Sequence, residues 1–358
     1  MSGAVPLRPL GAVAAYSIIA AVAIGLLYYG SALLIPLAVA IFIWHLINGL
    51  AGAYHRLAIG DHRLPGWLCH VAALLTILGA FAIMAQLITN NVAQVSEAAP
   101  GYEANLQELM TTMYDLVGLK TAPSFAQLAE QISVSSIVTT VAGTLGGFAG
   151  NAGIVIVYVV FLMVEQRVFD RKVQALFPDP KRAAQLREML ARISRQIQGY
   201  IWVKTLTSLL TGIVSFAIMW TVGVDFAQFW ALVIFLLNYI PIIGALLGVI
   251  FPSLLALVQF KTIGPFLTVS LALSATQFIV GNIVEPRMMG SKLNLSPLVV
   301  ILALALWGML WGVVGMILSI PIAVMVMIIC GHFEPTRPIA IMLSSDGEVG
   351  PYETEKVS

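Results

Sequence analysis

Two stretches of this sequence, residues 226–260 and 298–330, contain no charged residue. A membrane-spanning helix needs about 20 predominantly apolar residues, and both stretches are longer than that. The whole chain is 59% hydrophobic and 10% charged, whereas soluble domains carry about 25% charged residues. Only helices and closed barrels satisfy their backbone hydrogen bonds inside a bilayer. Barrel strands alternate apolar and polar residues, so these continuous apolar runs predict an all-α, polytopic integral membrane protein.

Apolar runs and the polar segments between them divide the chain into six parts. About eight transmembrane helices are expected, with broken or re-entrant helices in the C-terminal half. The parts are three N-terminal transmembrane helices at 1–90, an external amphipathic helical insertion at 91–149, a fourth transmembrane helix at 150–168, a cytoplasmic basic amphipathic helix at 169–201, a C-terminal core at 202–330 and a cytoplasmic tail at 331–358.

The distribution of basic residues predicts the orientation of these parts. Residues 165–204 contain nine lysines and arginines, whereas residues 91–150 contain only Lys120. Cytoplasmic segments of membrane proteins carry the excess of lysine and arginine. Both termini are therefore expected in the cytoplasm and residues 91–149 outside. The arginines of 169–201 are expected to contact membrane lipids.

Both charge-free stretches are interrupted by residues that disturb helices. A proline inside a helix removes a backbone hydrogen bond and kinks the helix. Paired, interrupted apolar segments point to the binding region of a transporter. Each stretch can be one long helix or a re-entrant hairpin, and the glycines permit close helix packing. The expected hinge or packing residues are Gly248, Pro252, Gly308, Gly312, Gly315 and Pro321.

Polar residues in and beside these stretches are the candidates for a transport site. An ionised carboxylate at the bilayer centre costs about 2.5–3.5 kcal/mol, so it normally faces a cavity or a partner. Glu285 can therefore bind a cation or a proton, or it can pair with Arg287 at the edge of an ordinary loop. The amides of Asn238 and Gln277 can coordinate an ion or join two helices. The candidate pathway residues are Asn238, Pro241, Gly244, Gln277, Asn282, Glu285, Pro286, Arg287, Gly290 and Pro297.

Other classes of function find little support in the sequence. No metal-ligand, redox or phosphate-binding motif is present, so no metal, cofactor or nucleic acid is expected. An intramembrane enzyme would need a nucleophile with a base, but His45 is the only histidine well inside an apolar run and no acidic residue accompanies it. We therefore expect no enzyme. A passive channel stays open as an alternative, with Glu285 repeated around an oligomer.

Three stretches of the C-terminal core together form one pattern of polar, proline and glycine residues. They are LNYIPIIGALLGVIFPSLLAL at 237–257, NIVEPRMMGSKLNLSPLVVILAL at 282–304 and WGVVGMILSIPIAVMV at 311–326. An Asn-aromatic-Ile-Pro-x-x-Gly segment is followed by Glu-Pro-x-x-x-Gly and by a glycine-rich segment with a proline. Together these stretches resemble the autoinducer-2 exporter family of bacterial permeases.

The resemblance implies a function and an assembly. Members of that family are associated with export of the quorum-sensing signal autoinducer-2 or with Na⁺(Li⁺)/H⁺ antiport. We therefore expect a secondary transporter of the bacterial inner membrane, with 202–330 as its transport core, that exports a small hydrophilic solute. Coupling to a proton or sodium gradient is expected, with antiport or a passive channel as alternatives. The resemblance also implies a homo-oligomer, with a pentamer as the expected assembly.

Overall fold

The structure is a computed structural model that describes residues 18–19, 21–56, 65–117, 152–289 and 294–348. These residues are almost entirely helical, and the described part of the chain contains no β-strand beyond one isolated bridge between Leu295 and Ser344. Seven helices in the described ranges are long and apolar enough to cross a membrane, and a shorter apolar helix spans Ala227–Leu237. The predicted all-α membrane class is confirmed, with a helix number close to the expected eight.

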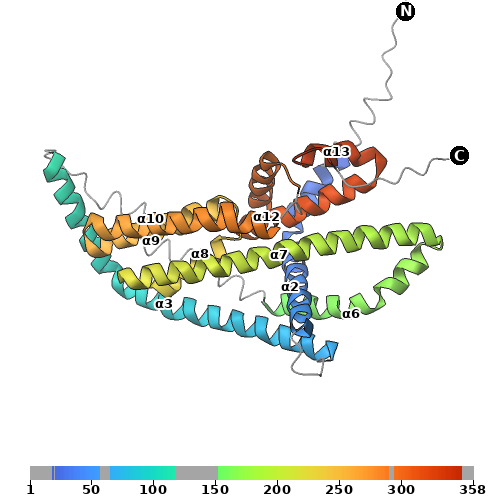
Figure 1. The fold of residues 1–358 in the computed structure, drawn as a ribbon, viewed down its shortest axis with the longest axis horizontal. Coiled ribbons are helices and arrows are strands. Elements are labelled where there is room, and N and C mark those ends of the chain that lie inside the picture. The colour runs from blue at the N-terminus through green and yellow to red at the C-terminus, as the bar shows by residue number, and fades with distance from the viewer. Residues whose placement is uncertain (1–17, 20, 57–64, 118–151, 290–293, 349–358) are drawn as a thin grey trace, which may run out of the picture. The chain divides into compact units, whose positions relative to one another are not determined.

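The described residues form two compact units, and each is a separate body of packed helices. The first unit comprises Met1–Trp44, Ile154–Met189 and Leu295–Ser358, and the second comprises His45–Gly153 and Leu190–Asn294. The helices (Figure 1) are α2 (Ser31–Arg56), α3 (Gly66–Val117), α6 (Ala152–Leu176), α7 (Pro180–Val222), α8 (Ala227–Leu237), α9 (Ile243–Phe260), α10 (Ile263–Ile279), η1 (Val280–Val284), α11 (Glu285–Met289), α12 (Pro297–His332), η2 (Glu334–Thr336) and α13 (Arg337–Leu343).

Helix α3 is longer than one membrane crossing. It continues for 52 residues, through Pro100, from the expected third span into the segment expected as an insertion. Its apolar span is Gly66–Asn91, and its second half packs against α8 and α9. No break therefore separates the third span from the first part of the insertion. The remainder of the insertion, from residue 118 to 149, lies outside the described residues.

The first charge-free stretch is a helical hairpin, which decides between the two forms left open by the sequence. Helices α8 and α9 pack against each other, and the turn between them contains Ile242 with a left-handed φ of 64°. A Cβ on Gly244 would lie 1.8 Å from the carbonyl oxygen of Leu237. Only glycine permits this approach. The chain therefore turns back at residues 238–242.

The second charge-free stretch also contains a sharp turn. Within α12, Gly312 has φ 60° and ψ −140°, so two helical arms meet there. A Cβ on Gly315 would lie 1.9 Å from the carbonyl oxygen of Trp307. The indole of Trp311 donates a hydrogen bond to the carbonyl of Leu27 at 2.9 Å. Glycine at 312 supplies the backbone conformation that other residues rarely adopt.

The C-terminal segment folds back on α12 within the first unit. Helix α13 packs against α12, and the backbone N–H of Ser296 donates to the carbonyl of Leu343 at 3.0 Å. Leu343 and Ser344 of the expected tail are thus tied to the start of α12. Residues 349–358 lie outside the described residues.

Candidate functional site

A stripe of polar side chains runs along one face of α7. Residues three or four positions apart share a helix face, and five such residues are buried despite lying in an apolar helix. Serine and threonine can satisfy their hydroxyls on their own helix. Thr211, for example, donates to the carbonyl of Thr207 at 2.8 Å. The stripe consists of Lys204, Thr207, Ser208, Thr211 and Ser215.

The charged member of this stripe forms an ion pair with Glu285. Lys204 Nζ donates to Glu285 Oε1 at 2.8 Å and to Oε2 at 2.9 Å. The side chains of Lys204 and Glu285 are 7% and 19% exposed. Removing a charge from water is costly unless it is paired and hydrogen-bonded. The two charges therefore compensate each other inside the second unit.

A widened helical turn precedes Glu285. Helix α10 continues into the π-helix η1, and Glu285 begins α11 directly after it. Single π turns are rare in proteins, but those that occur are often found at functional sites. The wider turn changes the direction of the side chains that follow it. Asn282, inside η1, donates to the carbonyl of Phe278 at 3.1 Å. It therefore hydrogen-bonds its own helix and is exposed rather than part of the ion pair.

The turn of the α8–α9 hairpin contacts the polar stripe beside the ion pair. The Asn238 amide donates to Ser208 Oγ at 3.1 Å. The Tyr239 hydroxyl donates to Thr205 Oγ1 at 2.8 Å. Ser208 lies one helical turn from Lys204, so the hairpin turn, the stripe and the ion pair form one continuous polar centre. We call Lys204, Glu285, Ser208, Asn238 and Tyr239 the polar centre.

Some of the residues predicted from the sequence meet here and others do not. Asn238 and Glu285 belong to the polar centre, Pro241 lies in the hairpin turn beside it, and Gly244 lies in the first turn of α9. Gln277 lies on α10 against α9, where a Cβ on Gly248 would be 3.2 Å from its Nε2. Pro252 is buried in α9, and Gly308 and Pro321 lie in the two arms of α12. The remaining pathway residues are the exposed Asn282, Pro286, Arg287 and Pro297, and Gly290, which lies outside the described residues.

One interpretation from the sequence is wrong. The alternative role of Glu285 was a surface pair with Arg287, but Arg287 is exposed and the carboxylate binds Lys204 instead. Sequence reasoning missed Lys204 because it was counted only among the basic residues that predict orientation. The available signal was the spacing of Gln196, Tyr200, Lys204 and Ser208, which places four polar side chains four residues apart on α7.

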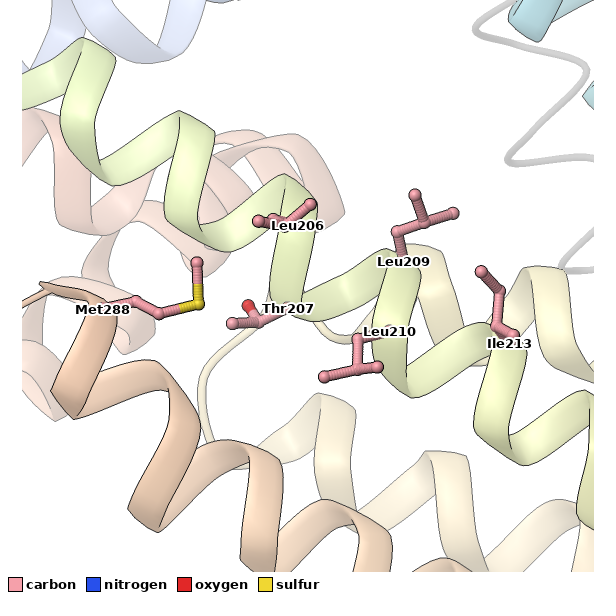
Figure 2. Close-up of a pocket in the computed structure, with 6 residues that line it drawn as sticks. All are labelled: Leu206, Thr207, Leu209, Leu210, Ile213 and Met288. Carbon is pink, nitrogen blue, oxygen red and sulfur yellow. The ribbon is translucent and has the colours of Figure 1, made fainter.

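A shallow groove adjoins the polar centre but has a different chemistry. It has a volume of about 250 Å³, and Figure 2 shows Met288 of α11 reaching toward Thr207 of α7 at one end. Thr207 is its single polar lining residue; the others are Leu206, Leu209, Leu210, Ile213 and Met288. An apolar groove on an apolar span suits hydrocarbon rather than a polar solute. The polar centre, not this groove, is therefore the candidate site.

A second polar cluster joins α3 to the turns at the other end of α7. The Tyr102 hydroxyl donates to Asp225 Oδ2 at 2.7 Å, and Lys261 pairs with Glu108. The backbone N–H of Asp225 donates to Gln259 Oε1 at 2.8 Å. Burial raises the pKa of Tyr102, and the hydrogen bond to Asp225 raises it further. We call these five residues the α3 clamp, because they fasten the second half of α3 to the ends of α7 and α9.

Comparisons with known proteins place these features in a family. The family model described as AI-2E family transporter matches residues 16–334. The AI-2 transport protein TqsA of Escherichia coli is 29% identical over 325 residues, which cover 88% of this chain and 90% of that protein. A relative in Haemophilus influenzae is 30% identical over 293 residues, covering 80% of this chain and 84% of that protein.

Proposed function

We propose that this chain, which belongs to the AI-2E transporter family, is a secondary transporter that exports a small hydrophilic solute across the bacterial inner membrane. The proposed solute is a signal of the autoinducer-2 type, and the proposed driving force is a proton or sodium gradient. A relative across most of the chain is named as a transport protein for AI-2, which supports this choice of solute. We further propose that both termini lie in the cytoplasm and that the protein works as a homo-oligomer.

The observation that carries the proposal is the buried ion pair between Lys204 and Glu285. Charged side chains within membrane-spanning segments are expensive, and they typically mark substrate pathways or proton relays. This pair can be opened by a proton on the Glu285 carboxylate or by a cation that replaces the lysine. Either event changes the charge of the polar centre, and this change would couple solute movement to an ion gradient.

The α8–α9 hairpin supplies a gate for this mechanism. Its turn is held on α7 by two hydrogen bonds, Asn238 to Ser208 and Tyr239 to Thr205. A neutral hydrogen bond contributes about 0.5–1.5 kcal/mol net, so both bonds can break within a transport cycle. Opening would expose the ion pair along the hairpin, whereas closure would cover it. A gated site favours a transporter over a permanently open channel.

Na⁺(Li⁺)/H⁺ antiport is the second candidate, and the same carboxylate favours it. A carboxylate among neutral oxygen ligands is the chemistry that binds a small hard cation, and Thr205, Thr207 and Ser208 supply hydroxyl oxygens on α7 within four residues of Lys204, the partner of Glu285. The two candidates differ in what the site carries rather than in which residues form it. Flux measurements separate them.

The test is flux into proteoliposomes that contain the purified protein. Autoinducer-2, sodium and protons are followed with an imposed pH gradient and without one. We expect uphill accumulation of autoinducer-2 under the gradient and its loss in Glu285→Gln. The control is Glu165→Gln, which alters an exposed carboxylate paired with Lys172 at 2.5 Å and should leave flux unchanged. Flux that only runs downhill would identify a channel, and gradient-driven sodium movement without autoinducer-2 would identify the antiporter.

A further inference from the structure

Tyr200 places a buried hydroxyl beside the polar centre. It lies on α7, one helical turn before Lys204 and on the same face, and it is 3% exposed. Its hydroxyl has no hydrogen-bond partner among the described residues. One turn earlier, the side-chain carbonyl of Gln196 also lacks a partner within the described part of the chain. Two successive turns of the face that leads to the ion pair thus carry buried polar atoms without a hydrogen-bond partner among the described residues.

Two groups of the polar centre lie within electrostatic range of the buried Tyr200 hydroxyl. The hydroxyl is close enough to Glu285 and Tyr239 for electrostatic interaction with both, and Tyr239 itself donates to Thr205. Ser253 and Gln277 also carry buried atoms without a partner, but they belong to α9 and α10. On the α7 face of Lys204, the unpartnered atoms are those of Tyr200 and Gln196.

A buried hydroxyl without a partner is unfavourable, and nearly all buried polar groups in proteins are hydrogen-bonded. A phenylalanine would fill the same space without this cost. We therefore expect the Tyr200 hydroxyl to form a hydrogen bond in another state of the transport cycle. Lys204 and Glu285 already neutralise each other, so a neutral partner can approach Tyr200 without opening the ion pair. A neutral hydroxyl group fits, because it both donates and accepts.

We infer that Tyr200 is a binding residue of the transport site, which hydrogen-bonds a neutral O–H group next to the Lys204–Glu285 pair, and that Gln196 extends this binding face by one turn. The O–H group belongs to a hydroxyl-bearing solute or to a water molecule that travels with the transported ion. This inference rests on the proposed function, because it assigns the class of group that the same site recognises.

The experiment compares Tyr200→Phe with the wild type and with a matched control. Tyr29→Phe removes the hydroxyl of a tyrosine that is 86% exposed. Thermal unfolding in detergent without solute is measured first. Tyr200→Phe should unfold at the same temperature as the wild type or a few degrees higher, because it removes an unpaired buried hydroxyl. A clear fall in unfolding temperature would show a structural hydrogen bond and would overturn the inference.

Transport in proteoliposomes then distinguishes the two sources of the O–H group. If a solute hydroxyl binds Tyr200, the KM for autoinducer-2 rises about tenfold in Tyr200→Phe, equivalent to about 1.4 kcal/mol, while the maximal rate is retained. If water binds there, KM is unchanged and the pH dependence of flux shifts instead. A variant that matches the wild type in KM and in pH profile would refute a binding role.

The measurements distinguish a wrong choice of solute from a wrong role for Tyr200. If the wild type does not carry autoinducer-2 but exchanges sodium for protons, the same KM and pH profile are measured for sodium. An effect of Tyr200→Phe on that exchange keeps the binding role and rejects only the solute. The Tyr29→Phe control should match the wild type in every measurement.

Discussion

A double-mutant cycle on Lys204 and Glu285 tests whether the buried pair works as a unit. The single changes are Lys204→Met and Glu285→Gln, and the double variant carries both. Each single change leaves one buried charge without its partner, whereas the double variant leaves none. The two charged groups are 2.8 Å apart, within the range in which direct coupling between two positions is expected.

The expected magnitudes follow from this geometry. At an effective dielectric constant of about 20, two unit charges at that distance attract each other by about 6 kcal/mol. Desolvation of both groups offsets much of this attraction, so replacing the whole pair by neutral residues should change stability little. Removing one partner of a buried pair typically costs about 3–5 kcal/mol. The coupling energy of the cycle should therefore be about 6 kcal/mol or more.

The assay is thermal unfolding of the purified protein in detergent, followed by flux measurements on every variant that folds. The matched control is the same cycle on Lys172 and Glu165, a pair at 2.5 Å whose side chains are 58% and 48% exposed. An exposed pair contributes about 0–1 kcal/mol, so its coupling energy should be small. Additive effects at Lys204 and Glu285 would refute the buried pair, and gradient-driven flux in the double variant would refute its role in coupling.

Three further predictions concern the turns and the clamp. Gly315→Ala should lower stability by about 1–3 kcal/mol or more, because its Cβ would overlap the carbonyl oxygen of Trp307; Gly264→Ala, where a Cβ meets nothing within 4 Å, should unfold like the wild type. Asn238→Ala should cost about 1 kcal/mol and increase flux in the absence of a gradient, measured in proteoliposomes. In the α3 clamp, the raised pKa of Tyr102 means that the folded state holds this proton more tightly; stability should therefore fall as the pH rises above about 10, and unfolding temperatures of Tyr102→Phe should show a smaller fall.

The sequence was sufficient to predict the fold class and two members of the polar centre. Charge-free runs predict membrane helices because burying backbone in lipid leaves few alternatives. Asn238 and Glu285 were visible because a polar residue among apolar ones is conspicuous. Their partners on α7 were not, because Lys204 and Glu285 are 81 positions apart. Helical periodicity shows which residues share a face but not which helix covers that face.

The form of the broken segments could not be predicted for a related reason. Pro241 and Gly312 allow a kink in a continuous helix as well as a reversal of the chain. The reversal depends on contacts made across each turn, such as Gly244 on the carbonyl of Leu237 and Gly315 on that of Trp307. A glycine in the sequence shows that close approach is permitted, but the neighbour that approaches is decided by tertiary packing.

The prediction of orientation does not depend on Lys204, although that residue was counted in it. A lysine neutralised by Glu285 contributes little to the positive charge of its segment. Without it, residues 165–203 still contain eight basic residues, against the single Lys120 of residues 91–150. The proposed orientation, with α7 starting in the cytoplasm and ending outside, therefore rests on these eight residues.

In the proposed orientation the polar centre has a depth that suits the proposed export. Lys204 lies 18 residues before the end of α7 at Val222, which corresponds to about 27 Å of helix. The hydrocarbon core is about 30 Å thick, so in the proposed orientation, with Val222 at the outer edge, the ion pair would lie close to the cytoplasmic edge. In that orientation Gln196 and Tyr200 lie on the cytoplasmic side of the pair, on the same face of α7. In the proposed mechanism the hairpin turn, which bonds Thr205 and Ser208 beside Lys204, gates the longer part of the route, between the ion pair and the outer edge.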